Sequence, residues 1–311
     1  MKIGYLLPTR DRAARGEYDL GGLIEQARRA ESLGFDSVWA GESPIARPRP
    51  DPLLVLAGVA AVTDRVTLGT AVLLPALRHP ILLAQQIATL DRISEGRLVI
   101  GAGGGFPTPA TEEQFAALGV GYARRISRLV ESLEVMRRLW SGRTVTFEGE
   151  HVDFRDIRLA PLPTGPDGPP LWLAGGGGHA LRRVAHHADG WLPYPPSAAA
   201  YAQDWSAIQQ AAVRTVTPAL YATLCLDDDP VRARQRLRVS IERYYNAPLE
   251  AVETIQAMFA GTPEQAAEWL SSYVVAGARH VVIRLAAEDH RPALEELAGR
   301  VMPLLTLKDD S

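Results

Sequence analysis

Length, composition and charge exclude several classes of protein at the outset. The chain has 311 residues, of which 47% are hydrophobic, so it can bury a large core. A formal net charge of -3 argues against nucleic acid or an anionic membrane surface as the main partner. Cys225 is the only cysteine, so no internal disulfide can form. The sequence also has no signal-peptide pattern and no apolar run near the roughly 20 residues that span a bilayer, which predicts a cytoplasmic protein.

Short β-rich runs alternate with helical patterns along almost the whole chain. Apolar and β-branched runs predict strands at 3–7, 36–40, 66–73, 98–102, 171–174, 190–192, 220–226 and 280–285. Apolar residues at helical spacing predict helices at 20–33, 52–62, 81–93, 122–140, 180–187 and 294–305. Two short runs predict a small hairpin insertion near 144–155. This alternation fits a single α/β domain over residues 1–311, a (β/α)8 TIM barrel.

The reactive face of such a barrel lies at the carboxyl ends of its strands. The residues expected there include no pair of carboxylates, no cysteine–histidine nucleophile and no cluster at metal-ligand spacing, so no metal is predicted. Lysine occurs only at Lys2 and Lys308, which excludes Schiff-base chemistry in the middle of the chain. A mouth that is rich in glycine and apolar surface favours a bound cofactor that carries the chemistry itself.

Two glycine runs follow predicted strands. Gly175, Gly176, Gly177 and Gly178, with His179 after them, precede a predicted helix, where backbone N–H groups and the helix N-terminus favour a phosphate. A flexible turn without a ligand is an equal alternative. Gly103 and Gly104 begin the second run, which lacks the spacing and the downstream acid of a dinucleotide fingerprint.

Glu42 follows the second predicted strand and is the candidate catalytic residue. A carboxylate at this position can act as an acid or base, or contact a substrate or a flavin edge. The alternative is a salt bridge to a loop arginine such as Arg47 or Arg49. His79, which precedes Pro80, is expected to cap the following helix.

A pocket for a ring system and a small organic substrate is expected near the same strand ends. Packing in the core is the alternative for each aromatic residue. The candidate pocket residues are Thr9, Trp39, Phe106, Trp191 and Tyr194, and the loops expected to shape the pocket are Glu42–Asp51, Phe106–Gly121 and Tyr194–Asp204.

At these positions the chain resembles the bacterial luciferase-like family of flavin- and deazaflavin-dependent oxidoreductases. The resemblance covers residues 1 to about 305 and implies the (β/α)8 barrel, a flavin-type ring at the strand ends and a homodimer. The matching segments are Ala30 to Trp39, Arg65 to Val72, Arg78 to Pro80, Ala84 to Asp91, Ser94 to Gly101, Gly142 to Phe154, Leu173 to Gly176 and Ala188 to Trp191.

The resemblance also implies roles for particular residues. It places a non-prolyl cis peptide at Ala71–Val72, against which the ring rests, and the cofactor phosphate at Gly175 to His179. The chain departs from the family pattern elsewhere. Many relatives have a histidine at the position of Glu42, deazaflavin users often have Asp-His in place of Gly41-Glu42, and an arginine of some flavin users falls on Gly104.

Three functional hypotheses follow from this resemblance. The first is an FMN-dependent monooxygenase that uses oxygen and receives reduced flavin from a separate reductase. The second is an F420-dependent reductase or dehydrogenase that transfers a hydride, and the third is a non-catalytic flavin-binding protein. Deazaflavin-binding relatives often hold the cofactor tail with lysines, and the chain has none mid-sequence, which favours FMN.

Overall fold

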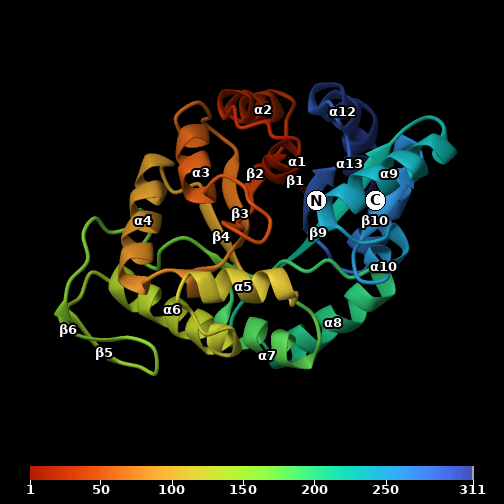
Figure 1. The fold of residues 1–311 in the computed structure, drawn as a ribbon. Helices are drawn as coiled ribbons and strands as arrows, with labels where there is room; N and C mark the ends of the chain where they lie inside the picture. Colours follow the sequence, from red (N-terminus) through yellow and green to blue (C-terminus); the bar gives the residue numbers. More distant parts are fainter. Residues whose placement is uncertain (310–311) are drawn as a thin grey trace. The chain divides into compact units, whose positions relative to one another are not determined.

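The computed structural model describes residues 1–309 and divides into two compact units (Figure 1). One unit comprises Met1–Trp39 and the chain from Leu173 onward, and the other comprises Ala40–Trp172. The predicted domain extends to residue 311, so its last two residues lie outside the described part.

The strands are those of a (β/α)8 barrel, which confirms the predicted fold class. They are β1 (Lys2–Leu6), β2 (Ser37–Ala40), β3 (Thr67–Leu73), β4 (Leu98–Ala102), β5 (Val145–Glu148), β6 (Asp153–Ile157), β7 (Leu171–Leu173), β8 (Gly190–Trp191), β9 (Thr217–Leu226), β10 (Met258–Gly261) and β11 (His280–Leu285). The sheet order is β10-β9-β11-β1-β2-β3-β4-β7-β8, and β8 also pairs with β9. Strand β10 is an addition beside β9, while β5 and β6 form the predicted hairpin as a separate sheet.

Each predicted helix is present, and further helices occupy segments that the sequence pattern left unassigned. The predicted ones are α2 (Gly21–Ser32), α3 (Pro52–Ala60), α4 (Pro80–Ile93), α6 (Arg125–Trp140) after the turn η2 (Tyr122–Arg124), α7 (Gly178–His187), and the C-terminal series α12 (His290–Glu296), η3 (Leu297–Val301) and α13 (Met302–Asp309). The additional ones are α1 (Thr9–Ala14), the turn η1 (Pro75–Leu77), α5 (Pro109–Ala117), α8 (Ala198–Ala211), α9 (Pro230–Tyr245), α10 (Leu249–Glu253) and α11 (Pro263–Val275). None of the described helices has the length and apolar character needed to cross a membrane.

Two of the predicted pocket loops are therefore partly helical. Helix α5 lies within the predicted loop Phe106–Gly121, and α8 begins within Tyr194–Asp204. Local caps explain both, because the Thr108 and Ser197 hydroxyls accept the N–H groups of Thr111 and Ala200 at the first turn of each helix.

In the unit that contains both chain ends, parallel strands place polar residues side by side. In the parallel register of these strands, Gly4 pairs with Ser37, and His280 pairs with Lys2. The Ser37 hydroxyl lies 2.7 Å from His280 Nε2 and accepts a hydrogen bond from Trp39 Nε1 at 2.7 Å. A Cβ on Gly4 would lie 2.4 Å from the Ser37 oxygen, so only glycine allows this buried group to form.

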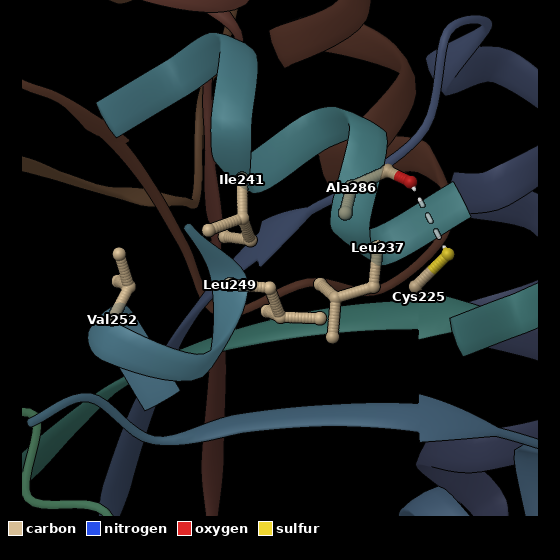
Figure 2. Close-up of a cluster of buried hydrophobic side chains, with 6 residues drawn as sticks. All are labelled: Cys225, Leu237, Ile241, Leu249, Val252 and Ala286. Atoms are coloured by element: carbon tan, nitrogen blue, oxygen red, sulfur yellow. Dashed lines mark hydrogen bonds between the residues drawn. The ribbon is translucent and has the colours of Figure 1, made fainter. Parts of the chain in front are cut away.

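The same unit carries an additional layer after β9. Figure 2 shows Leu237 and Ile241 of α9 packed with Leu249 and Val252 of α10. The Cys225 thiol at the end of β9 donates to the Ala286 carbonyl at 3.4 Å, and burial raises its pKa to about 11. This apolar cluster fixes α9 and α10 beside the ends of β9 and β11.

In the other unit, β3 pairs in parallel with β4, and the register shifts between Thr70 and Leu73. Helix α3 begins at a strong cap, because Asp51 Oδ1 accepts the N–H groups of Leu53 and Leu54 at 2.9 and 3.2 Å. His79 caps α4 as predicted, with its Nδ1 accepting the Ile81 N–H. Aspartate and histidine thus begin the helices that follow β2 and β3.

Candidate active site

Glu42 lies at the end of β2, held by backbone and side-chain bonds within the unit Ala40–Trp172. Its Oε2 accepts the Leu74 N–H at 2.6 Å, and its Oε1 accepts a hydrogen bond from Arg78 Nη1. The carboxylate is only 5% exposed. Arg78 Nη2 also donates to Asp51 Oδ2 at 2.7 Å, so one guanidinium joins two carboxylates. The predicted alternative of a salt bridge is therefore present, but its partner is Arg78 rather than Arg47 or Arg49.

The environment of Glu42 shifts the balance between its charged and neutral forms. Burial is the largest cause and raises the pKa of this carboxyl, while Arg78 and the Leu74 N–H act in the opposite direction. A carboxyl with a raised pKa beside a pocket is a reasonable group for proton transfer. The pocket has a volume of about 240 Å³ and is bordered by Glu42, Arg78, Asp51 and Arg49, with apolar surface from Leu77 and Leu118.

The backbone beside Glu42 comes very close to β3. The Glu42 N–H donates to the Val72 carbonyl at 3.2 Å, and the Ala71–Val72 peptide bond is cis, as the resemblance implies. A Cβ on Gly41 would lie 2.8 Å from the Ala71 carbonyl oxygen and 2.7 Å from Arg49 Nη1. Glycine at position 41 therefore permits the end of β2 to lie against the segment that the resemblance assigns to the cofactor ring.

Replacing Gly41 by alanine is expected to destabilise the protein. The added methyl group meets a backbone carbonyl, which cannot move without displacing β3, and overpacking of this kind costs about 1–3 kcal/mol. Urea denaturation of Gly41→Ala measures the loss. Gly121→Ala is the matched control, because a Cβ there meets nothing within 4 Å. Equal stability of Gly41→Ala and the wild type would contradict the close approach.

Gln114 of α5 is a positioning residue that the sequence pattern does not reveal. Its side-chain oxygen accepts hydrogen bonds from the Ile45 N–H at 3.0 Å, the Ala46 N–H at 2.9 Å and the Ser43 hydroxyl at 3.1 Å. The buried amide thereby fixes the loop that begins at Glu42. A single polar residue in a helix gives no sequence signal of this role, since most such residues face solvent.

Gly103, Gly104 and Phe106 follow β4 in the same unit. The Gly103 N–H donates to the Leu73 carbonyl at 2.9 Å, which places this segment beside the end of β3. A Cβ on Gly104 would lie 2.4 Å from the Ile126 side chain. Phe106 is partly exposed, so its ring remains a candidate pocket surface.

The glycine run in the other unit has the backbone geometry of an open anion loop. Gly175 and Gly177 have φ values of 119° and 80°, which side chains rarely adopt, and α7 begins at Gly178. A Cβ on Gly177 or Gly178 would meet nothing within 4 Å, so a ligand atom has room to approach these N–H groups. His179 Nδ1 lies 2.9 Å from Arg182 Nη2, which adds a cation near the helix start.

The Asp204 carboxylate lies beside this loop and affects how much negative charge a bound group can carry there. Asp204 Oδ2 is 3.4 Å from the point where a Cβ on Gly176 would stand. Burial raises the pKa of Asp204, and no hydrogen bond or ion pair of this carboxylate occurs within the described residues. The loop therefore fits a phosphate group, but the adjacent acid disfavours a second negative charge on it.

The tryptophans expected to line the pocket are instead buried. Trp191 is packed against Tyr201 and Trp205. Its Nε1 donates to the Gly175 carbonyl at 2.9 Å, so its side chain holds the backbone of the glycine loop. Trp39 packs edge-on against His280. Neither ring has surface to offer a ligand, which corrects the expectation of flat pocket walls. Apolar size alone does not distinguish these two roles in a sequence.

Thr9 and Tyr194 also lie in this unit. Thr9 is the first residue of α1 and is buried, so it too differs from an open pocket residue. Tyr194 is partly exposed, and burial of its hydroxyl raises its pKa. Its place as a substrate contact stays a prediction.

A buried charge cluster on β11 and α9 was not predicted. Arg284 Nη2 donates to Asp11 Oδ1 at 2.5 Å and to the Ser240 hydroxyl at 2.8 Å. The ring of Tyr244 lies between the guanidinium groups of Arg284 and Arg10, each 4.1 Å from its centroid. A lone arginine in an apolar strand, Ile283-Arg284-Leu285, was the available signal. Among the described residues, no group of histidine, cysteine, aspartate and glutamate has the geometry of a metal site.

The fold is a barrel, with an open glycine loop in one unit and a buried acid beside a small pocket in the other. Comparison with known proteins identifies the class. The model of the luciferase-like monooxygenase family matches residues 1–280. The chain belongs to this family, and it is an oxidoreductase.

Individual relatives agree with the assignment. An F420-dependent glucose-6-phosphate dehydrogenase of Kineococcus radiotolerans is 27% identical over 98% of this chain and 97% of its own length. The uncharacterized protein Rv0953c of Mycobacterium tuberculosis is 40% identical over 54% of this chain and 66% of its own length. The crystal structure of monooxygenase RslO1 from Streptomyces bottropensis superposes with a TM-score of 0.83 at 25% identity, covering 97% of this chain and 99% of that one.

Proposed function

We propose that this chain is an F420-dependent oxidoreductase that transfers a hydride between the deazaflavin and a small organic substrate. The observation that carries the proposal is its similarity, over 98% of the chain, to a dehydrogenase named for F420. This reverses the preference for FMN that the absence of mid-chain lysines suggested. Arginine is abundant in the chain and can replace lysine as a partner for anionic groups.

The glycine loop supports the same choice of cofactor. The phosphate of FMN is a monoester, whose second ionisation has a pKa near 6, whereas F420 carries its phosphate as a diester with a single charge. The Asp204 carboxylate beside Gly176 repels a dianion more strongly than a monoanion. The loop N–H groups at Gly177 and Gly178 are unobstructed for either phosphate. Asp204 thus favours the diester.

The residues of the unit Ala40–Trp172 then have roles in the proposed reaction. Bound F420 supplies the hydride acceptor or donor, and the chain supplies position and proton transfer. Glu42 is the group that holds or releases a proton, since its Oε atoms lie beside the small pocket and its pKa is raised. Arg78 and the Leu74 N–H fix the orientation of the carboxylate. With F420 no partner flavin reductase is needed.

A monooxygenase that uses FMN is the second candidate, and the similarity to the monooxygenase RslO1 favours the monooxygenase part of it. We also propose a homodimer. The exposed side chains of Leu54 on α3 and Leu82 on α4, at 76% and 59%, support this proposal.

Separate titrations with F420 and FMN test the cofactor assignment. We expect F420 to bind the purified apo chain at least about tenfold more tightly, a difference of about 1.4 kcal/mol. Asp204→Asn is expected to improve FMN binding more than F420 binding, because it removes the repelling charge. Asp167→Asn, an exposed aspartate of the other unit, is the charge-matched control. Tighter binding of FMN by the wild type would overturn the assignment, and identical FMN affinity in Asp204→Asn would remove Asp204 from it.

A further inference from the structure

The ends of β9 and β11 contain buried polar atoms without partners. Arg284 is 1% exposed, and its Nε and Nη1 form no hydrogen bond. Thr223 is 0% exposed, and its Oγ1 likewise has no partner. Buried donors are almost always paired in folded proteins, so unpaired ones that occur together require an explanation. None of these three atoms is used in the proposed cofactor site.

The two residues lie next to each other because of the strand register. In the parallel pair of β9 and β11, Arg284 is the register partner of Thr223. Partners in adjacent strands project their side chains from the same face of a sheet. The two side chains therefore project from the same face, and both are buried.

The guanidinium is held rigidly in this position. Asp11 and Ser240 both accept from Nη2, which leaves Nη1 and Nε to other acceptors. The Tyr244 ring covers one face of the guanidinium, and Arg10 lies over the same ring at 4.1 Å. Asp11 offsets one of the two positive charges, and the fixed guanidinium with two open donors beside a second arginine still favours an oxygen-rich anion.

We propose that Arg284 and Thr223 form a subsite for a substrate oxyanion, either a carboxylate or a phosphate group. An anionic oxygen has several lone pairs, so one such group can accept from Nη1 and from the Thr223 hydroxyl together. The substrate class is accordingly a small organic acid or a phosphate ester. The assignment of this anion to the substrate rests on the proposed oxidoreductase function. The existence of an anion subsite at Arg284 and Thr223 does not depend on that function.

Calorimetric titration of the apo chain tests the subsite, with inorganic phosphate in one arm and acetate in the other. We expect saturable binding of at least one of these anions. The anion that binds more tightly shows whether the subsite takes a phosphate or a carboxylate. Thr223→Val has the same shape without the hydroxyl, and should bind the anion about tenfold more weakly. Because this hydroxyl has no partner in the protein, Thr223→Val without anion should melt at the wild-type temperature or above it.

Thr70→Val is the matched control. Thr70 is also a buried strand threonine, but its hydroxyl donates to the Gly101 carbonyl at 2.8 Å. This variant should melt at a lower temperature and bind the anion as the wild type does. Arg284→Lys, which keeps the charge but loses the planar donors, should weaken anion binding further than Thr223→Val.

Three results would overturn the subsite. These are no binding of either anion, unchanged affinity in Thr223→Val, or a melting temperature of Thr223→Val reduced as much as that of Thr70→Val. F420 titration separates this proposal from the first one. In the wild-type chain, anion binding without F420 binding contradicts the proposed function alone, and F420 binding without anion binding contradicts the subsite alone. Thr223→Val should bind F420 as the wild type does.

Discussion

Glu42→Gln is expected to lower turnover by about a hundredfold or more. Glutamine has the same shape and can still accept the Leu74 N–H, but it can neither carry a proton nor neutralise Arg78. Loss of a positioned general acid or base typically costs 10²–10⁴-fold. Steady-state kinetics with the F420-loaded chain measures the effect. Turnover equal to that of the wild type would remove Glu42 from the mechanism.

Asp51→Asn separates the role of Glu42 from that of charge balance around Arg78. Asp51 contacts the same guanidinium but is 37% exposed, and asparagine caps α3 as well as aspartate does. We expect its turnover to stay within a few-fold of the wild type. If Asp51→Asn and Glu42→Gln lose turnover equally, then neutralisation of the Arg78 charge, rather than proton transfer by Glu42, determines turnover.

The pH dependence of turnover gives an independent measure of the same group. Arg78 lowers the pKa of Glu42 against the larger effect of burial. Arg78→Met removes this opposing effect, so the pKa should rise further. The limb of the pH–rate profile that reports Glu42 should then move to higher pH. A profile that does not move would assign that limb to another group.

Acid is expected to destabilise the protein strongly between about pH 6.5 and pH 4. Burial lowers the pKa of His280 to about 3 and that of His290 to about 4. Unfolded histidine titrates near 6.5, so in this range the unfolded chain binds protons that the folded chain does not. The stability that each neutral histidine contributes is present above about pH 6.5 and is lost as the pH falls toward its folded pKa. At pH 4.5 each group contributes a loss of roughly 2–3 kcal/mol.

Urea denaturation at several pH values measures this loss. His280→Gln should be less stable at neutral pH, because the Ser37 contact changes, but its stability should fall less steeply with acid. His186→Gln replaces an exposed histidine and should keep the wild-type slope. Parallel curves for His280→Gln and the wild type would contradict a buried, neutral imidazole at position 280.

Most of the barrel was predictable because its signals are local. The apolar runs at 66–73 and 280–285 correspond to β3 and β11, and Gly34 just after α2 has a φ of 88°. The sequence of helix α9 has comparable signals, although no helix was predicted there. Asp229 and Pro230 form its start, and Ala233, Leu237 and Ile241 lie on one buried face.

The candidate site was predicted only in part, because its geometry depends on distant residues. Glu42 was found from its place after a strand, but its ion pair with Arg78 depends on the loop after β3. Gln114 and Arg284 bind segments far apart in the sequence, so their partners are not visible in the sequence pattern, although Arg284 stands out within an apolar strand. The burial of Trp191 beneath the glycine loop likewise follows from tertiary packing, which periodicity does not encode.

Anaerobic hydride transfer tests the central claim most directly. The full chain is loaded with oxidised F420 and mixed, without oxygen, with a panel of small alcohols, organic acids and phosphate esters. We expect loss of the F420 absorbance with at least one substrate and no requirement for oxygen. Persistent F420 absorbance with every substrate, together with oxygen consumption when reduced FMN is supplied instead, would contradict it.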